Sequence, residues 1–217
     1  MNLLEARTRL RSWLQEPDPT FYTNSELNEW LNSASFEATK DVNYPWKLWQ
    51  EDLEADTAAY SMPSDFIRFH PLYNVYCRDD KLDKRDQKWL EHTYPSYREA
   101  ESVEYPEIYY HDTPTTITLY PPPSTAVTDG LEGYYVYKET TMTNDAHTTL
   151  ILTNYPYLAL YRAILNAEIK QDDDTPKHRD LQYWEAKYLA EVQKVRAFLN
   201  RFIRGHGTRT VSPVEMD

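Results

Sequence analysis

The hydrophobic repeat of this 217-residue chain changes twice along its length. Near both ends, apolar residues recur every three to four positions, which is the repeat of a helix with one buried face. From about residue 46 to residue 150, short apolar or alternating runs stand between proline, aspartate and serine clusters, which is typical of strands. We therefore predict an α+β fold, in which residues 1–45 and 151–204 form a four-helix bundle and residues 46–150 form a β-rich insert.

Two helices are predicted before the insert. The first covers residues 2–15, and Pro17 and Pro19 end it, because proline lacks the backbone donor that a helix interior needs. The second starts at Thr23 and Glu26, whose spacing is that of a capping box. Trp30 lies on the stripe of this second helix that we expect to be buried.

Two further helices are predicted after the insert. One begins near Asn154 and repeats alanine every four residues, a small-residue stripe that permits close helix approach. The other follows Pro176, and its apolar residues alternate steps of three and four over about seven turns. Its predicted buried stripe includes Trp184 and runs through Leu181, Trp184, Tyr188, Val192, Val195, Leu199 and Phe202. We expect the polar tail at residues 205–217 to become ordered only on binding a partner.

The insert contains five segments with the composition of strands. They cover residues 58–62, 72–77, 107–110, 115–120 and 133–138. Residues 85–92 are the one stretch of the insert that we predict to be helical.

Charge divides the chain as well. The formal net charge is −12, and residues 46–150 carry 9 basic and 19 acidic side chains. A surface of this charge repels phosphate, so we expect no sequence-specific nucleic-acid binding. Past Glu191 the next acid is Glu215, and the basic side chains between them are Lys194, Arg196, Arg201, Arg204 and Arg209.

Residue patterns for catalysis are missing from the sequence. Four glycines, none in a phosphate-loop pattern, exclude the common nucleotide-binding loops, and the six histidines show no metal-ligand spacing. There is no Gly-x-Ser-x-Gly element. We therefore expect no enzymatic activity, no cofactor and no metal.

Compartment signals are equally sparse. The single cysteine, Cys77, fits a protein folded in a reducing cytosol. The N-terminus lacks the apolar region of a signal peptide, and no segment has the length of a membrane span, so we expect no membrane partner.

The order of four sequence stretches resembles the head-to-tail adaptor family of tailed phages, also called head completion or portal adaptor proteins. These stretches are residues 10–18 with 21–32, residues 60–68, residues 118–123 with their proline run, and residues 157–163. The resemblance implies a ring, typically of twelve copies, between the portal protein and the tail or nozzle proteins in the virion neck. It also implies synthesis in the host cytoplasm, and a ring that forms part of the channel through which double-stranded DNA passes.

The resemblance and the charge division together suggest two sets of functional residues. A channel that passes DNA without holding it should present acids to its lumen. We expect the lumen during genome ejection to be lined by Glu51, Asp52, Glu54, Asp56, Glu99, Glu101 and Glu104. We expect the portal to be contacted by Lys194, Arg196, Arg201, Arg204 and Arg209.

Other functions remain open from the sequence. A tail-tube or tail-tip ring protein would differ mainly in its neighbours. A carbohydrate-binding or glycoside-active protein could use paired carboxylates such as Glu51 and Asp52, and aromatic clusters such as Tyr109 and Tyr110. We favour packing and interface roles for these aromatic side chains.

Overall fold

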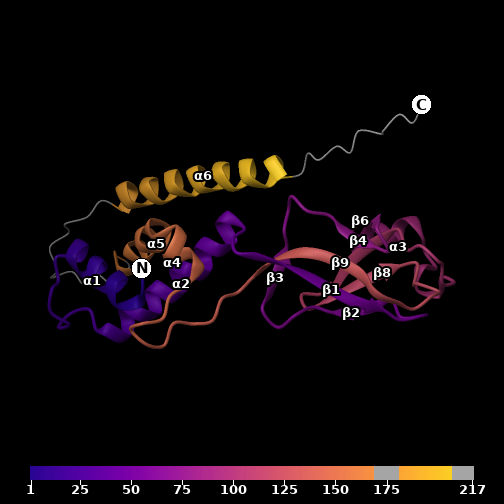
Figure 1. The fold of residues 1–217 in the computed structure, drawn as a ribbon, viewed down its shortest axis with the longest axis horizontal. Helices are drawn as coiled ribbons and strands as arrows, with labels where there is room; N and C mark the ends of the chain where they lie inside the picture. The colour runs from indigo at the N-terminus through magenta and orange to yellow at the C-terminus, as the bar shows by residue number, and fades with distance from the viewer. Residues whose placement is uncertain (169–180, 207–217) are drawn as a thin grey trace, which may run out of the picture. The chain divides into compact units, whose positions relative to one another are not determined.

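A computed structural model describes residues 1–168 and 181–206 (Figure 1). The chain separates into two compact units. The first, here called the helical unit, contains Met1–Val42 and the chain from Glu139 onward, and the second, the β unit, is Asn43–Lys138. The predicted α+β class is confirmed.

The helical unit contains five helices among its described residues. They are α1 (Leu3–Leu14), α2 (Asn24–Val42), α4 (Leu150–Asn154), α5 (Pro156–Glu168) and α6 (Leu181–His206). The sequence predicted two helices after residue 150, and the structure has three there. The additional helix α4 forms because the Thr149 hydroxyl accepts a hydrogen bond from the Leu152 amide at 3.1 Å and so caps its first turn.

Capping boxes begin the first two helices. At α2 the Thr23 amide donates to the Glu26 carboxylate at 2.9 Å, and the Glu26 amide donates to the Thr23 hydroxyl at 3.3 Å. Asn2 and Glu5 make the same exchange at α1, which the sequence analysis did not anticipate. Each box satisfies two backbone donors that the first turn leaves without a helical partner.

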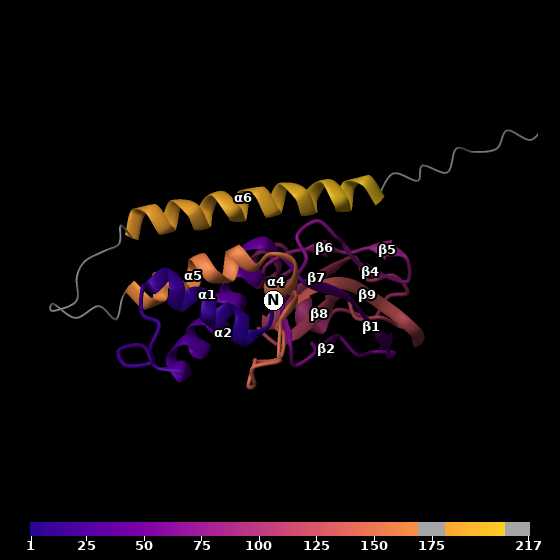
Figure 2. The ribbon, with the colours of Figure 1, turned by 60° about the vertical axis from the view of Figure 1, so that its left-hand side comes forward.

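Small side chains let the central helices approach closely. Helix α5 packs mainly against α2 and α6, and Figure 2 shows α6 running alongside α5. Five alanines in α2 and α5 are fully buried, namely Ala34, Ala38, Ala159, Ala163 and Ala167. The alanine repeat seen in the sequence therefore lies in the core of this unit.

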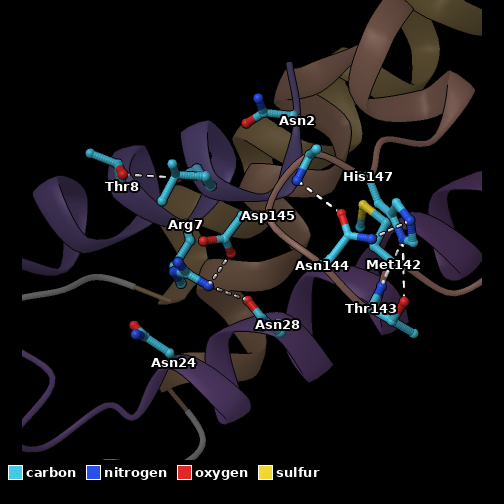
Figure 3. Close-up of polar contacts among 12 residues, drawn as sticks. Asn2, Arg7, Thr8, Asn24, Asn28, Met142, Thr143, Asn144, Asp145 and His147 are labelled. Carbon is cyan, nitrogen blue, oxygen red and sulfur yellow. Dashed lines mark hydrogen bonds and ion pairs between the residues drawn. The ribbon is translucent and has the colours of Figure 1, made fainter.

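The loop that precedes α4 is bound to the first two helices (Figure 3). The Arg7 guanidinium lies 3.1 Å from the carboxylate of Asp145 and donates to Asn28 at 3.1 Å. The Asn32 side chain exchanges two hydrogen bonds with the backbone of Met142. Residues far apart in sequence are thus joined before α4 and α5 begin.

The β unit contains two antiparallel-rich sheets. One has the order β1-β9-β4-β5, with β3 also paired to β9, and the other has the order β2-β8-β7-β6. The strands are β1 (Trp46–Leu53), β2 (Ala59–Ser61), β3 (Phe66–Phe69), β4 (Val75–Cys77), β5 (Asp80–Lys81), β6 (Asp83–Lys84), β7 (Ile108–Thr113), β8 (Thr116–Tyr120) and β9 (Val127–Tyr137). Helix α3 (Gln87–Thr93) and a 3₁₀ turn (Tyr97–Glu99) lie between β6 and β7 in the chain.

One shared core joins the two sheets. Trp49, Leu131 and Tyr135 come from the first sheet, and Tyr60 and Ile117 come from the second. Gly133 permits the close packing of β9, because a Cβ there would lie 3.0 Å from the Phe69 ring.

Among the helices of residues 1–168 and 181–206, none is long and apolar enough to cross a membrane.

Candidate assembly surfaces

The basic side chains near the C-terminus point away from α6 in different directions. Lys194 lies 3.3 Å from the Glu191 carboxylate, one turn before it. Arg196 is directed toward α2, where its Nε donates to the Asp41 carbonyl at 2.5 Å. Arg201 and Arg204 are exposed near the end of the helix. Arg209 lies outside the described residues.

Polar contacts fix α6 and α5 against α2. The Tyr188 hydroxyl donates to the Asp41 carboxylate at 2.5 Å, and Arg162 of α5 pairs with Glu37 of α2. Burial, followed by the bond to Asp41, raises the pKa of Tyr188 far above its ordinary value, so the phenol stays a hydrogen-bond donor. The direction in which α6 presents its outer face is therefore set by buried contacts along its middle.

Stacked aromatic rings add a second attachment at the start of α6. Trp184 lies 5.6 Å from Trp13 of α1 and 5.9 Å from Tyr161 of α5, measured between ring centroids. Trp13 also stacks on Tyr161 at 5.6 Å. The spacing of apolar residues predicts a structural position for Trp184 but not its ring partners, because spacing along one helix does not show which other helices it meets.

The predicted buried stripe of α6 differs from the observed one at its ends. Leu181 and Phe202 are each about half exposed, while Ile203 is buried. The stripe drifts around the helix because 3.6 residues per turn do not match a seven-residue repeat.

Trp30, on α2, lies edge-on to Tyr22 with ring centroids 5.6 Å apart.

All seven acids proposed for the lumen are exposed on the β unit. Glu51 and Asp52 belong to β1, and the Asp52 carboxylate accepts the Asp129 amide at 2.8 Å. The two groups, at residues 51–56 and 99–104, meet where the Ser102 hydroxyl donates to Asp56 at 2.5 Å. Glu104 forms an ion pair with Arg78 at 3.5 Å. Glu54, Glu99 and Glu101 complete the set.

The aromatic side chains considered for sugar binding divide between core and surface. Tyr109, Tyr110 and Tyr135 are buried, whereas Tyr134 is partly exposed and stacks on Tyr73 at 4.5 Å. The buried rings serve packing.

The imidazole of His70 and the thiol of Cys77 are both buried in the β unit. Burial lowers the pKa of His70 to about 4 and raises the pKa of the Cys77 thiol to about 11. Both are therefore neutral at pH 7. Within the part of the chain that the structure describes, no three His, Cys, Asp or Glu side chains are grouped to hold a metal ion.

Comparison with known families places this protein among the phage head-to-tail adaptors, which are structural proteins. A model of the SU10 adaptor protein family matches residues 1–214, and the chain therefore belongs to that family. Comparison with curated proteins gives no match. Membership confirms the resemblance found in the sequence and makes the chain a structural component of the virion neck.

Proposed function

We propose that this adaptor forms a ring of twelve copies below the portal, continues the DNA channel and provides the platform to which tail or nozzle proteins bind. Family membership supports the location between head and tail. The single observation that carries the rest is the charge division: acids are exposed on the β unit, while α6 carries only basic charges after Glu191. The basic end of α6 and the acidic β unit suit different neighbours.

The β unit faces the channel in this proposal. Its exposed acids, Glu51, Asp52, Glu54, Asp56, Glu99, Glu101 and Glu104, repel the phosphate backbone, so DNA moves past without being held. Glu54 and Glu101 are the best sites for a test, because within residues 1–168 and 181–206 neither side chain makes a hydrogen bond or ion pair, in contrast to Asp52 and Asp56.

The test of the channel assignment reverses two charges. The double variant Glu54→Lys with Glu101→Lys should slow genome packaging or ejection several-fold, because lysines in a lumen bind phosphates. The control Glu29→Lys makes one such charge reversal at an exposed site of the helical unit. Equal rates for the double variant and the wild type would reject the lumen assignment.

The end of α6 faces the portal in this proposal. Arg201 and Arg204 are exposed there, and Arg209 extends the basic sequence beyond the described residues. Mass measurement of the full-length protein, with and without purified portal rings, should give a complex of many copies on each portal. The double variant Arg201→Glu with Arg204→Glu should bind weakly, while Lys88→Glu on the β unit should bind normally. No complex with the wild type would overturn the proposed function.

A further inference from the structure

One side of α6 combines an exposed aromatic surface with basic charge. Phe198 is 59% exposed, the highest value among the large hydrophobic side chains described in residues 1–168 and 181–206. Phe202 follows one turn later and is half exposed, so the two rings are neighbours on the helix surface. Lys194 precedes Phe198 by one turn; it pairs with Glu191 of its own helix at 3.3 Å, and its side chain is 75% exposed, so its ammonium group can also reach a carboxylate of another chain. This surface, Lys194 with Phe198 and Phe202, is called the α6 face below.

The β unit carries a groove of matching character. It has a volume of about 370 Å³, in the range of binding pockets, and it is lined by Tyr94, Val103, Glu104, Tyr105, Glu107, Ile108, Tyr120 and Pro121. Tyr94 and Tyr105 are both more than two-fifths exposed. The rings of Tyr94 and Tyr120 lie 5.2 Å apart. An aromatic wall and two carboxylates therefore border one recess, here called the Tyr94 groove.

Opposite charge and shared aromatic character make the two surfaces complementary. Aromatic rings contribute large apolar contact area at low entropy cost, and a helix presenting residues one turn apart is a common occupant of an apolar groove. Lys194 would meet a carboxylate at the rim of the groove. Glu107 is exposed there, and Arg78 pairs with Glu104 and not with Glu107. Glu104 already pairs with Arg78, so Glu107 is the carboxylate available to an incoming ammonium group.

We propose that the α6 face of one copy binds the Tyr94 groove of a second copy of this chain. The inference rests on the ring of the proposed function, and it names the contact between neighbouring subunits. A patch that binds a different patch on an identical chain makes a head-to-tail contact, which closes into a ring when the rotation between copies permits. Lys194 and Glu107 would then form the ion pair of this contact, leaving Arg201 and Arg204 for the portal.

A charge exchange tests the contact between copies. Full-length chains carrying either Lys194→Glu or Glu107→Lys should each lose most ring formation on portal rings, with bound copies reduced about tenfold, because like charges would face each other. Mixed in equal amounts, the two variants should recover rings near the wild-type mass. In an alternating ring every contact again joins opposite charges, which cannot happen if the contact lies within one chain.

A matched pair on α6 tests the aromatic part. Phe198→Ala should reduce bound copies several-fold, because it removes the most exposed ring of the face. Leu189→Ala is the control, since Leu189 is 51% exposed and nine residues earlier, roughly on the opposite side of the helix at about 100° per residue. Leu189→Ala should assemble like the wild type.

The outcomes separate this inference from the proposed function. If the wild type forms rings but the mixture of charge variants does not recover them, the contact between copies is rejected and the adaptor function stands. Normal rings with Phe198→Ala would reject the contact as well. If the wild type itself forms no ring on the portal, the proposed function fails and the inference falls with it.

Discussion

The helical unit and the β unit fill their cores in opposite ways. In the helical unit, fully buried alanines such as Ala38 and Ala163 let helix backbones come close together. In the β unit, Trp49, Tyr60 and Tyr135 span the space between the sheets. Packed sheets lie about 10 Å apart, a distance that small side chains cannot fill. The two units should therefore respond differently to changes of side-chain volume, and each should lose stability within its own boundaries.

The largest expected effect comes from emptying the β core. Leu131 on β9 is fully buried, so Leu131→Ala should lower the free energy of unfolding by about 2–5 kcal/mol through lost burial and the cavity left behind. Hydrogen exchange measured peptide by peptide should rise within residues 43–138 and remain unchanged in α2 and α5. Equal increases in both units would show that they unfold together, and would contradict the expectation that each unit loses stability separately.

Enlarging a side chain should have its effect in the helical unit. Ala163→Leu inserts volume into a fully buried position of α5 and should cost about 1–3 kcal/mol by forcing helices apart. Thermal unfolding and hydrogen exchange of residues 24–42 and 156–168 would measure it. Ala186→Leu is the control, because Ala186 is exposed on α6. A stable Ala163→Leu protein would mean that the helices are not closely packed.

Acid should weaken the β unit through His70. Burial lowers its folded pKa to about 4, while the unfolded chain has an ordinary histidine with a pKa of about 6.5. Between these values the unfolded state binds a proton that the folded state does not, so this stability is complete above pH 6.5 and is lost as the pH falls. From pH 7.5 to pH 5.5 the loss should be about 1 kcal/mol.

His70→Asn isolates this effect. Asparagine retains an acceptor near the Leu72 amide, which donates to His70 Nδ1 at 3.3 Å in the wild type, but it does not titrate. Urea unfolding at the two pH values should show a smaller acid loss in the variant. His92→Asn makes the same change at an exposed site and serves as the control.

The smallest effect concerns helix ends. Thr23→Ala removes the acceptor for the Glu26 amide and should destabilise the helical unit by about 1 kcal/mol. Thr23→Ser retains the hydroxyl and should lie near the wild type in urea unfolding. A loss for Thr23→Ser equal to that of Thr23→Ala would show that the methyl group, and not the cap, matters.

Helices and strands whose formation depends on residues close together in the chain could be predicted from the sequence. The spacing of Thr23 and Glu26 located the start of α2, and the alternation in residues 115–120 located β8. Strand β1 was not predicted, because its Lys47, Gln50, Glu51 and Asp52 are polar and their strand conformation depends on pairing with β9, far along the chain. The same dependence on distant partners hid β3.

Prediction of the candidate surfaces had the same limit. Charge counts indicated a basic C-terminal region, but only the structure shows that Arg196 is directed to the Asp41 carbonyl. Phe198 is not part of the predicted buried stripe of the last helix, and this position in the sequence already indicates that it is exposed. The Tyr94 groove brings together three segments of chain, residues 94, 103–108 and 120–121, and no spacing rule predicts such a meeting.

The chain enters and leaves the β unit at neighbouring positions. Trp46, at the start of β1, pairs with Val136, near the end of β9, because the two strands are antiparallel neighbours. To the helices, the whole of residues 43–138 is equivalent to a single closed loop, and the entropy of closing a loop rises only slowly with its length. Insertions and deletions within this unit should therefore cost the helical unit little stability. The β unit can therefore change in length or composition without moving the two chain ends that the helical unit holds.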